Sequence, residues 1–119
     1  MRKLIAGACA LAIAAAWGTA QAQSRRAMEA QETGVASIHQ WMKVGRKTCM
    51  VDHFHDGSGN GPSRKQAETA AIRAWSEFTA WEYGTPWGRY AIAESKKMDC
   101  SQGGMGWNCA VQARPCRPY

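Results

Sequence analysis

Between residues 23 and 119 the chain has no leucine, and this absence limits the core that it can build. Leu, Ile, Val and Phe together number nine in that stretch, well below the ~20% of residues under which disorder is suspected. The same stretch holds five tryptophans and four cysteines, which favour a folded domain. We therefore predict a small core of aromatic, alanine and methionine side chains reinforced by disulfides. Such a core is too small for a buried cofactor or a deep catalytic cleft.

The first 22 residues have the three parts of a secretory signal peptide. Arg2 and Lys3 form a charged start, residues 4–17 are apolar, and Ala-Gln-Ala at 20–22 is a small-x-small cleavage site. The apolar stretch of about 14 residues is shorter than the ~20 that a helix needs to cross a bilayer. We therefore predict a periplasmic or secreted protein without stable membrane insertion. A retained N-terminal anchor is the alternative.

Cys9 falls in the predicted signal peptide, so four cysteines remain for the exported chain of about 97 residues. An even number of cysteines in a small exported chain predicts two disulfides. A zinc site on these sulfurs is disfavoured, because no two of them have Cys-x-x-Cys spacing. The four residues are Cys49, Cys100, Cys109 and Cys116.

The C-terminal part of the sequence predicts a β-hairpin that pairs two of these cysteines. Residues 90–100 and 107–113 are predicted strands on either side of a four-residue loop, Gly-Gly-Met-Gly at 103–106. This register places Cys100 opposite Cys109. We therefore favour a disulfide between them, and the two remaining cysteines then pair with each other.

The composition divides the chain into three parts. Residues 1–22 are the signal peptide, residues 23–45 are a polar arm that we predict to be flexible or partly helical, and residues 46–119 form a small disulfide-linked α+β domain. Within the domain, residues 47–56 alternate as a strand does. The glycine-rich residues 56–62 are predicted to form a loop.

The clearest helical pattern begins at Ser63. Ser63 and Gln66 have the spacing of a capping box, and apolar residues follow at helical spacing until Gly84 and Pro86 end the run. We predict that this helix packs on a small antiparallel sheet, which is an α+β architecture. A helix over residues 90–97 is an alternative to the strand predicted there. The apolar residues of the main helix are Ala67, Ala71, Trp75, Phe78 and Trp81.

His53 and His55 are the strongest metal-binding signal in the sequence. Two residues apart on a predicted strand, they point to the same side and could chelate one Cu²⁺ or Zn²⁺ ion. The preferred interpretation is two histidines that hydrogen-bond locally at the end of a strand, and metal binding is the alternative. A complete site requires a third donor, and the spacing of the sequence does not identify it. Asp56 is the first candidate, and three other residues are alternatives. These alternatives are His39, Glu77 and Glu82.

The start of the predicted helix could also bind an anion. Ser63 stands at the N-terminus, where backbone N–H groups point outward, and Arg64 and Lys65 follow it. The residues do not match the phosphate-loop pattern, so no nucleotide chemistry is predicted. A weak anion site at Ser63, Arg64 and Lys65 remains an expectation.

Aromatic residues concentrate between positions 75 and 90. With no leucine available, we assign most of these rings to the core rather than to a ligand platform. Trp87 is predicted to be the most exposed of them, because it follows Pro86 in a turn. The rings are Trp75, Phe78, Trp81, Tyr83, Trp87 and Tyr90.

Residues 23–119 carry 13 basic and 9 acidic residues, which gives a net charge of +4. The basic residues are dispersed, which suits attraction to anionic surfaces and matches no nucleic-acid motif. No catalytic arrangement of side chains is recognisable. We therefore predict a non-enzymatic binding or structural module that contacts an anionic envelope component or a protein partner. The alternative function is copper or zinc binding by His53 and His55.

Several short strings in the sequence form a combined pattern. They are His53-Phe-His55-Asp-Gly-Ser-Gly, Glu82-Tyr83-Gly84, Gly106-Trp107-Asn108-Cys109 and Pro115-Cys116. In this combination the chain resembles small exported proteins of alphaproteobacteria, over about residues 46–116. The resemblance implies a periplasmic or secreted location in a Gram-negative bacterium. It implies no particular activity and no catalytic residue.

Overall fold

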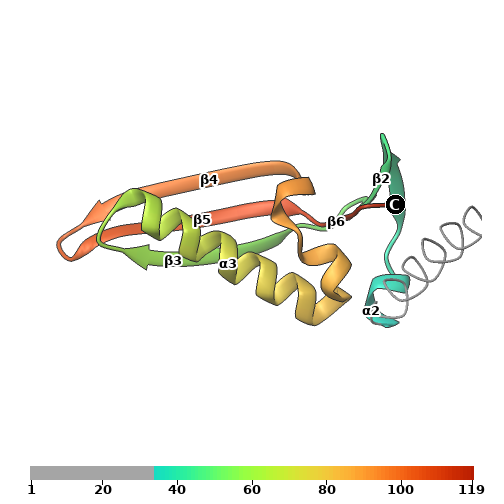
Figure 1. Ribbon diagram of the computed structural model, residues 1–119, viewed down its shortest axis with the longest axis horizontal. Helices are drawn as coiled ribbons and strands as arrows, with labels where there is room; N and C mark the ends of the chain where they lie inside the picture. Colours follow the sequence, from blue (N-terminus) through green and yellow to red (C-terminus); the bar gives the residue numbers. More distant parts are fainter. Residues whose placement is uncertain (1–33) are drawn as a thin grey trace, which may run out of the picture. The chain divides into compact units, whose positions relative to one another are not determined.

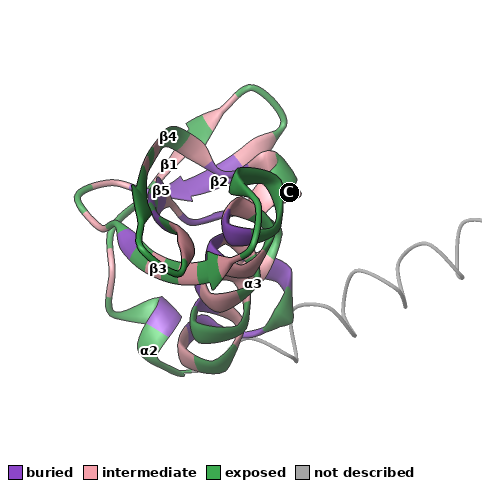
Figure 2. Cartoon of the chain, turned by 90° about the vertical axis from the view of Figure 1, so that its left-hand side faces the viewer, coloured by how far each residue is buried: buried purple, intermediate pink, exposed green. Residues whose placement is uncertain are grey.

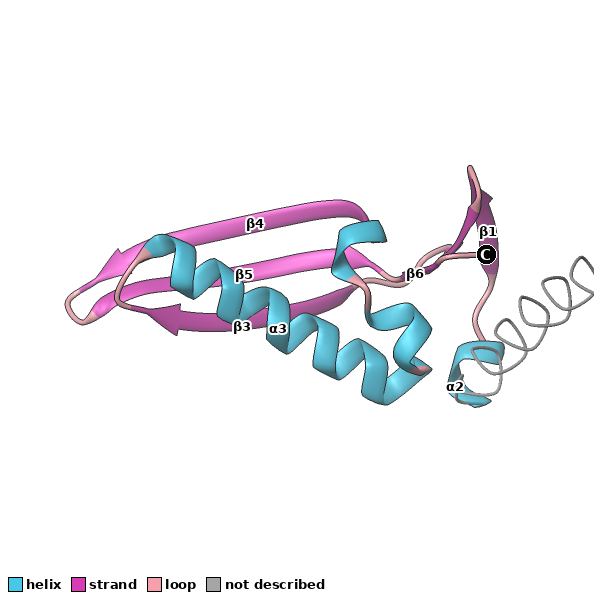
Figure 3. Ribbon diagram, viewed as in Figure 1, coloured by secondary structure: helices cyan, strands magenta, loops and turns pink. Residues whose placement is uncertain are grey.

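The computed structural model describes residues 34–119. All of these residues belong to one compact unit of the chain, Gln31–Tyr119. The predicted signal peptide and the first part of the predicted arm lie outside the described residues. Figure 1 shows the chain in sequence colours, and Figure 3 shows its helices and strands. The elements are α2 (Gly34–Ser37), β1 (Trp41–Val44), β2 (Lys47–Met50), β3 (His55–Gly61), α3 (Arg64–Tyr83), two 3₁₀ turns, η1 (Thr85–Gly88) and η2 (Tyr90–Ile92), β4 (Glu94–Gly103), β5 (Gly106–Arg114) and β6 (Cys116–Arg117).

The predicted α+β architecture is confirmed. Three antiparallel strands form one sheet in the order β3-β5-β4, and the long helix α3 runs along this sheet (Figure 1). A second antiparallel sheet has the order β1-β2-β6. Strand β5 ends at Arg114 and β6 begins at Cys116, so one short stretch of chain passes from the first sheet into the second.

Both disulfides are present in the predicted pairing. Cys100 and Cys109 lie opposite each other in the β4–β5 hairpin, as the register of the hairpin predicts. Cys49 and Cys116 face each other on β2 and β6, and their bond ties the second sheet to the C-terminus. The end of β2, from Thr48 to Met50, is buried (Figure 2).

Helix α3 begins and ends where the sequence predicts. Ser63 is its N-cap and accepts a hydrogen bond from the backbone N–H of Gln66, and Gly84 follows its last residue with a φ of 105°. The buried face of α3 has one residue per turn, which is the spacing that a helix packed on a sheet requires. These residues are Ala67, Ala71, Trp75, Thr79 and Tyr83.

Strand β3 is the main difference from the sequence prediction, which made residues 56–62 a loop. Residues 55–61 pair along their whole length with β5. Alternate residues of β3 face α3, and from Gly57 to Gly61 all of these are glycine. A Cβ atom at Gly57, Gly59 or Gly61 would lie less than 3.0 Å from atoms of α3. The glycines therefore let the helix approach the strand backbone directly.

This close approach sets a repeating register between β3 and α3. Two residues of a strand advance about 6.6 Å, and four residues of a helix advance about 6 Å, so strand–helix contacts recur nearly in step. Gly61 lies against Gln66 and Ala67, Gly59 against Ala70 and Ala71, and Gly57 against Ala71 and Trp75. The next position on the same face of β3 is His55, and the next turn of the helix carries Thr79.

Gly59→Ala tests the glycine contact. The added methyl would meet the backbone of α3, and such overpacking is expected to cost about 1–3 kcal/mol of the free energy of unfolding. Ser58→Ala, on the opposite and exposed face of β3, is the matched control and should change it by less than about 0.5 kcal/mol. Urea unfolding of both variants measures the difference. Equal stability of the two would contradict direct helix-on-glycine packing.

Two other boundaries differ from the sequence prediction. The predicted strand over residues 47–56 is divided into β2 and the start of β3, and residues 90–92 form a 3₁₀ turn before β4 begins at Glu94. Part of the predicted arm is folded, because β1 pairs with β2 along its length. The paired domain therefore begins before residue 46.

The buried side chains form two clusters. One lies between α3 and the β3-β5-β4 sheet and is centred on Trp75, whose Nε1 donates to the carbonyl of Ala113 over 3.2 Å. The other contains Ala36, Met50, Tyr83 and Trp87.

The prediction that Trp87 is exposed is wrong, because its side chain is fully buried. Pro86 and Trp87 lie in η1, which follows α3 and turns the ring of Trp87 toward Tyr83 and Trp41. Among the tryptophans that the structure describes, Trp81 is the most exposed, at 77%.

Candidate metal centre

The candidate centre lies where the glycine register of β3 ends. His55 is the first residue of β3, and His53 precedes it on the same side. Thr79 and Glu82 are on the last turns of α3. The helix lies close to the strand along the glycines, so His55 is the first large side chain of β3 that meets α3.

Three potential ligand atoms converge at this point. His55 Nε2 lies 2.7 Å from Glu82 Oε2 and 3.1 Å from His53 Nε2. The ligand atoms of all three residues lie within 4.8 Å of one another. His55 is 3% exposed, whereas the side chain of Glu82 is 26% exposed, so the cluster reaches from the interior to the surface.

The hydrogen bonds of Thr79 fix which nitrogen of His55 carries its proton. Thr79 Oγ1 lies 2.7 Å from the carbonyl of Trp75 and 2.9 Å from His55 Nδ1. The hydroxyl has one hydrogen, and the carbonyl can only accept. Both contacts are hydrogen bonds only if Thr79 donates to Trp75 and His55 Nδ1–H donates to Thr79. In neutral His55 the lone pair then sits on Nε2, which faces the other two ligand atoms.

Burial keeps both imidazoles neutral. Burial is the largest cause and, together with the neighbouring His53, lowers the pKa of His55 below the ordinary 6.5, whereas Glu82 acts in the opposite direction. Burial also lowers the pKa of His53, and the nearby His39 adds to that shift. At neutral pH both rings are therefore able to offer a lone pair.

With the proton of neutral His55 on Nδ1, the contacts around its Nε2 call for a second proton or a cation. A hydrogen on His53 Nε2 can bridge to the lone pair of His55, but an ionised Glu82 has no hydrogen to share with the same atom. A nitrogen lone pair and a carboxylate oxygen 2.7 Å apart repel each other unless a proton or a cation lies between them. A metal cation would satisfy all three atoms at once.

The structure places Glu82, rather than Asp56, with the two imidazoles. Asp56 is the neighbour of His55 on β3 and so points to the opposite face, where its carboxylate accepts a hydrogen bond from Gln112 Nε2 over 3.1 Å. Glu77 is exposed and is not part of the converging group. Among the residues that the structure describes, a second group contains Glu68, Cys100 and Cys109, but its two sulfurs form a disulfide.

Thr79→Val tests the role of the hydroxyl. Without its acceptor, the proton of His55 is no longer held on Nδ1, and loss of such a hydrogen-bond partner weakens metal binding by about 10- to 100-fold. Thr79→Ser keeps the acceptor and is expected to bind zinc nearly as well as the wild type. Competition with a chromophoric chelator measures both affinities. Equal affinities of the valine and serine variants would contradict the tautomer assignment.

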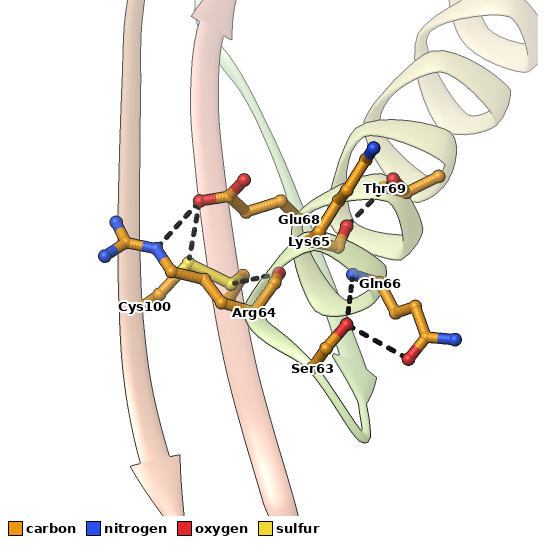
Figure 4. Close-up of polar contacts among 8 residues, drawn as sticks. Ser63, Arg64, Lys65, Gln66, Glu68, Thr69 and Cys100 are labelled. Carbon is orange, nitrogen blue, oxygen red and sulfur yellow. Dashed lines mark hydrogen bonds and ion pairs between the residues drawn. A yellow bond between two sulfur atoms is a disulfide. The ribbon is translucent and has the colours of Figure 1, made fainter.

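The predicted anion-binding residues do not converge (Figure 4). The Ser63 hydroxyl is engaged as the helix cap with Gln66, and Arg64 is paired with Glu68 over 2.9 Å. Lys65 points away from Ser63. Anion binding at this helix end therefore remains a prediction.

Several basic side chains are engaged within the domain. Lys47 and Lys97 form ion pairs with Glu94 and Asp99. Others lie over aromatic rings. Lys96 lies over Tyr90, Arg114 over Phe54, and Arg117 over Trp41, Trp87 and Tyr119. Contact with an anionic envelope component remains a prediction.

Comparison of the chain with protein-family models, with curated proteins and with solved structures gave no match. Within residues 34–119, no helix has both the length and the apolar character that crossing a membrane would require.

Proposed function

We propose that this protein binds one Zn²⁺ or Cu²⁺ ion through His53, His55 and Glu82. The observation that carries the proposal is the convergence of His53 Nε2 and Glu82 Oε2 on His55 Nε2. Two neutral imidazoles and a carboxylate are ligands that both ions accept. The hydrogen bond from His55 Nδ1 to Thr79 is the usual outer support of a metal-binding imidazole.

The dimensions of the cluster suit an ion of this size. Ligand atoms about 2.0–2.1 Å from a tetrahedral ion lie about 3.3 Å apart. The two separations around His55 Nε2 are 2.7 and 3.1 Å, so the side chains would open by less than about 1 Å to admit the ion. The rings of His53 and His55 have centroids 5.0 Å apart. Two imidazoles that share a tetrahedral ion require about 5 Å.

The proposed setting is the periplasm or the exterior of the cell. Two disulfides are typical of proteins that fold in an oxidising compartment. There the protein would hold the ion without catalysing a reaction. Its role would be to bind or carry zinc or copper.

Calorimetric titration of the metal-free protein with Zn²⁺ and with Cu²⁺ tests this function. One of the two ions should bind with a stoichiometry of one per chain and should raise the melting temperature, because binding to the folded state alone stabilises it. If neither ion gave saturable binding or a change in melting temperature, the proposed function would be wrong.

A further inference from the structure

The structure points to a fourth protein ligand for the proposed ion. The three converging side chains leave one position of a tetrahedral ion open. Among the described residues, the third histidine of the chain, His39, lies beside this group. Its ring centroid is 4.5 Å from that of His53, slightly less than the 5.0 Å between His53 and His55.

His39 is held loosely where it stands. Its backbone N–H donates to the carbonyl of Ala36 over 3.4 Å, and its Nε2 lies 3.3 Å from the hydroxyl of Tyr83. Both separations exceed the usual range of hydrogen bonds. The ring is half-buried, so neither packing nor hydrogen bonding fixes it tightly.

Space for the ring to move is also present. A surface cavity of 240 Å³ is lined by Ile38, His39, Gln40, Asp52 and His53. His39 and His53 therefore border the same open volume. The ring of His39 therefore has free space on the side that faces this cavity.

The Tyr83 hydroxyl lies beside His39 and can act as its outer hydrogen-bond partner. The ring of Tyr83 is fully buried and stacks on His55, with centroids 4.8 Å apart. Its hydroxyl can accept a hydrogen bond from Nε2–H of His39. The lone pair of His39 is then on Nδ1, which is the pattern of a metal-binding imidazole held by a second-shell partner.

We propose that His39 is the fourth ligand, so that the ion closes a site of three imidazoles and one carboxylate. This inference rests on the proposed function. His39 lies between α2 and β1, and Glu82 is in the last turn of α3. His53 precedes β3, and His55 is its first residue. The bound ion therefore fastens the segment that enters β1 to the end of the long helix.

X-ray absorption spectroscopy of the zinc-loaded protein measures how many imidazoles coordinate the ion. Three are expected in the wild type and two in His39→Ala, with a zinc affinity at least about tenfold lower in the variant. Tyr83→Phe is the companion variant, because it removes the hydroxyl contact of His39 but keeps the imidazole. It should retain three imidazoles, with a zinc affinity between those of the wild type and His39→Ala.

The outcomes separate this inference from the proposed function. Two imidazoles in the wild type, together with equal zinc affinity of wild type and His39→Ala, would overturn the fourth ligand and leave the three-residue site in place. Wild-type protein that binds no zinc or copper would overturn both.

Hydrogen exchange gives a second readout of the same proposal. Zinc should slow exchange of the amides of residues 38–44 in the wild type and have less effect in His39→Ala. Val51 N–H, which donates to the carbonyl of Gln40 over 2.9 Å, reports on the same junction. Equal protection by zinc in both proteins would overturn the fastening of this segment.

Discussion

Replacement of both His53 and His55 by Ala is expected to weaken zinc binding by about a hundredfold or more, since loss of a ligand's hydrogen-bond partner alone costs about 10- to 100-fold. The double variant removes two of the three converging ligand atoms and leaves Glu82 and the proposed ligand His39. Chelator competition at neutral pH measures the change.

The control for this experiment separates ligand loss from loss of the fold. His55 is buried, so circular dichroism must first establish that the double variant is folded. If the double variant is unfolded, the single variant His53→Ala, at a half-buried position, is tested in its place. Glu82→Gln and Glu77→Gln form a matched pair on the same helix. Zinc affinity should fall in the first and remain unchanged in the second. An unchanged affinity of the histidine variants would rule out the site.

Removal of the Cys49–Cys116 disulfide, by replacement of both residues with Ala, is expected to cost about 4 kcal/mol of the free energy of unfolding. The bond joins residues 67 apart in the sequence, and the chain-entropy cost of closing a loop grows with its length. Strand β6 has only two residues, so its backbone pairing with β2 is short. For so small a core, the loss approaches the whole stability of the domain.

The second disulfide provides the comparison. Cys100 and Cys109 are nine residues apart, and their bond stabilises by about 2.5 kcal/mol on the same entropy model. Urea unfolding should therefore rank the Cys49/Cys116 variant as less stable than the Cys100/Cys109 variant. The reverse order would contradict the view that the long-range link holds the domain together.

Local signals in the sequence predict α3 and the β4–β5 hairpin well. A capping serine, one apolar residue per turn and a terminal glycine act within the helix itself, and the hairpin loop fixes the register of Cys100 and Cys109. These elements required no knowledge of the rest of the chain. The fold class and both disulfides follow from them.

Strand β3 could not be predicted in the same way, because glycine has a low intrinsic preference for strands. Its glycines suit a strand only because α3 lies against them. The signal that could have revealed the strand is a period of two: histidine or glycine recurs at every second position, which places these residues on one face. They are His53, His55, Gly57, Gly59 and Gly61.

The two histidines of the candidate site could be predicted from the sequence, but the carboxylate could not, because it depends on the packing of β3 against α3. The spacing of His53 and His55 places both imidazoles on one side, but Glu82 is 27 residues beyond His55 and joins them only through the register of β3 and α3. With residues 56–62 predicted to form a loop, Asp56 is the carboxylate nearest to the two histidines in the sequence. Trp87 likewise depends on tertiary contacts, because its turn faces Tyr83 rather than solvent.

Nitrogen-15 NMR of the histidine side chains tests the central claim most directly. In the metal-free protein at neutral pH, His55 should carry its proton on Nδ1. One equivalent of Zn²⁺ should shift the Nε2 resonances of His53 and His55 and leave that proton in place. A proton on Nε2 of His55, or Nε2 resonances that do not respond to saturating zinc, would contradict the account.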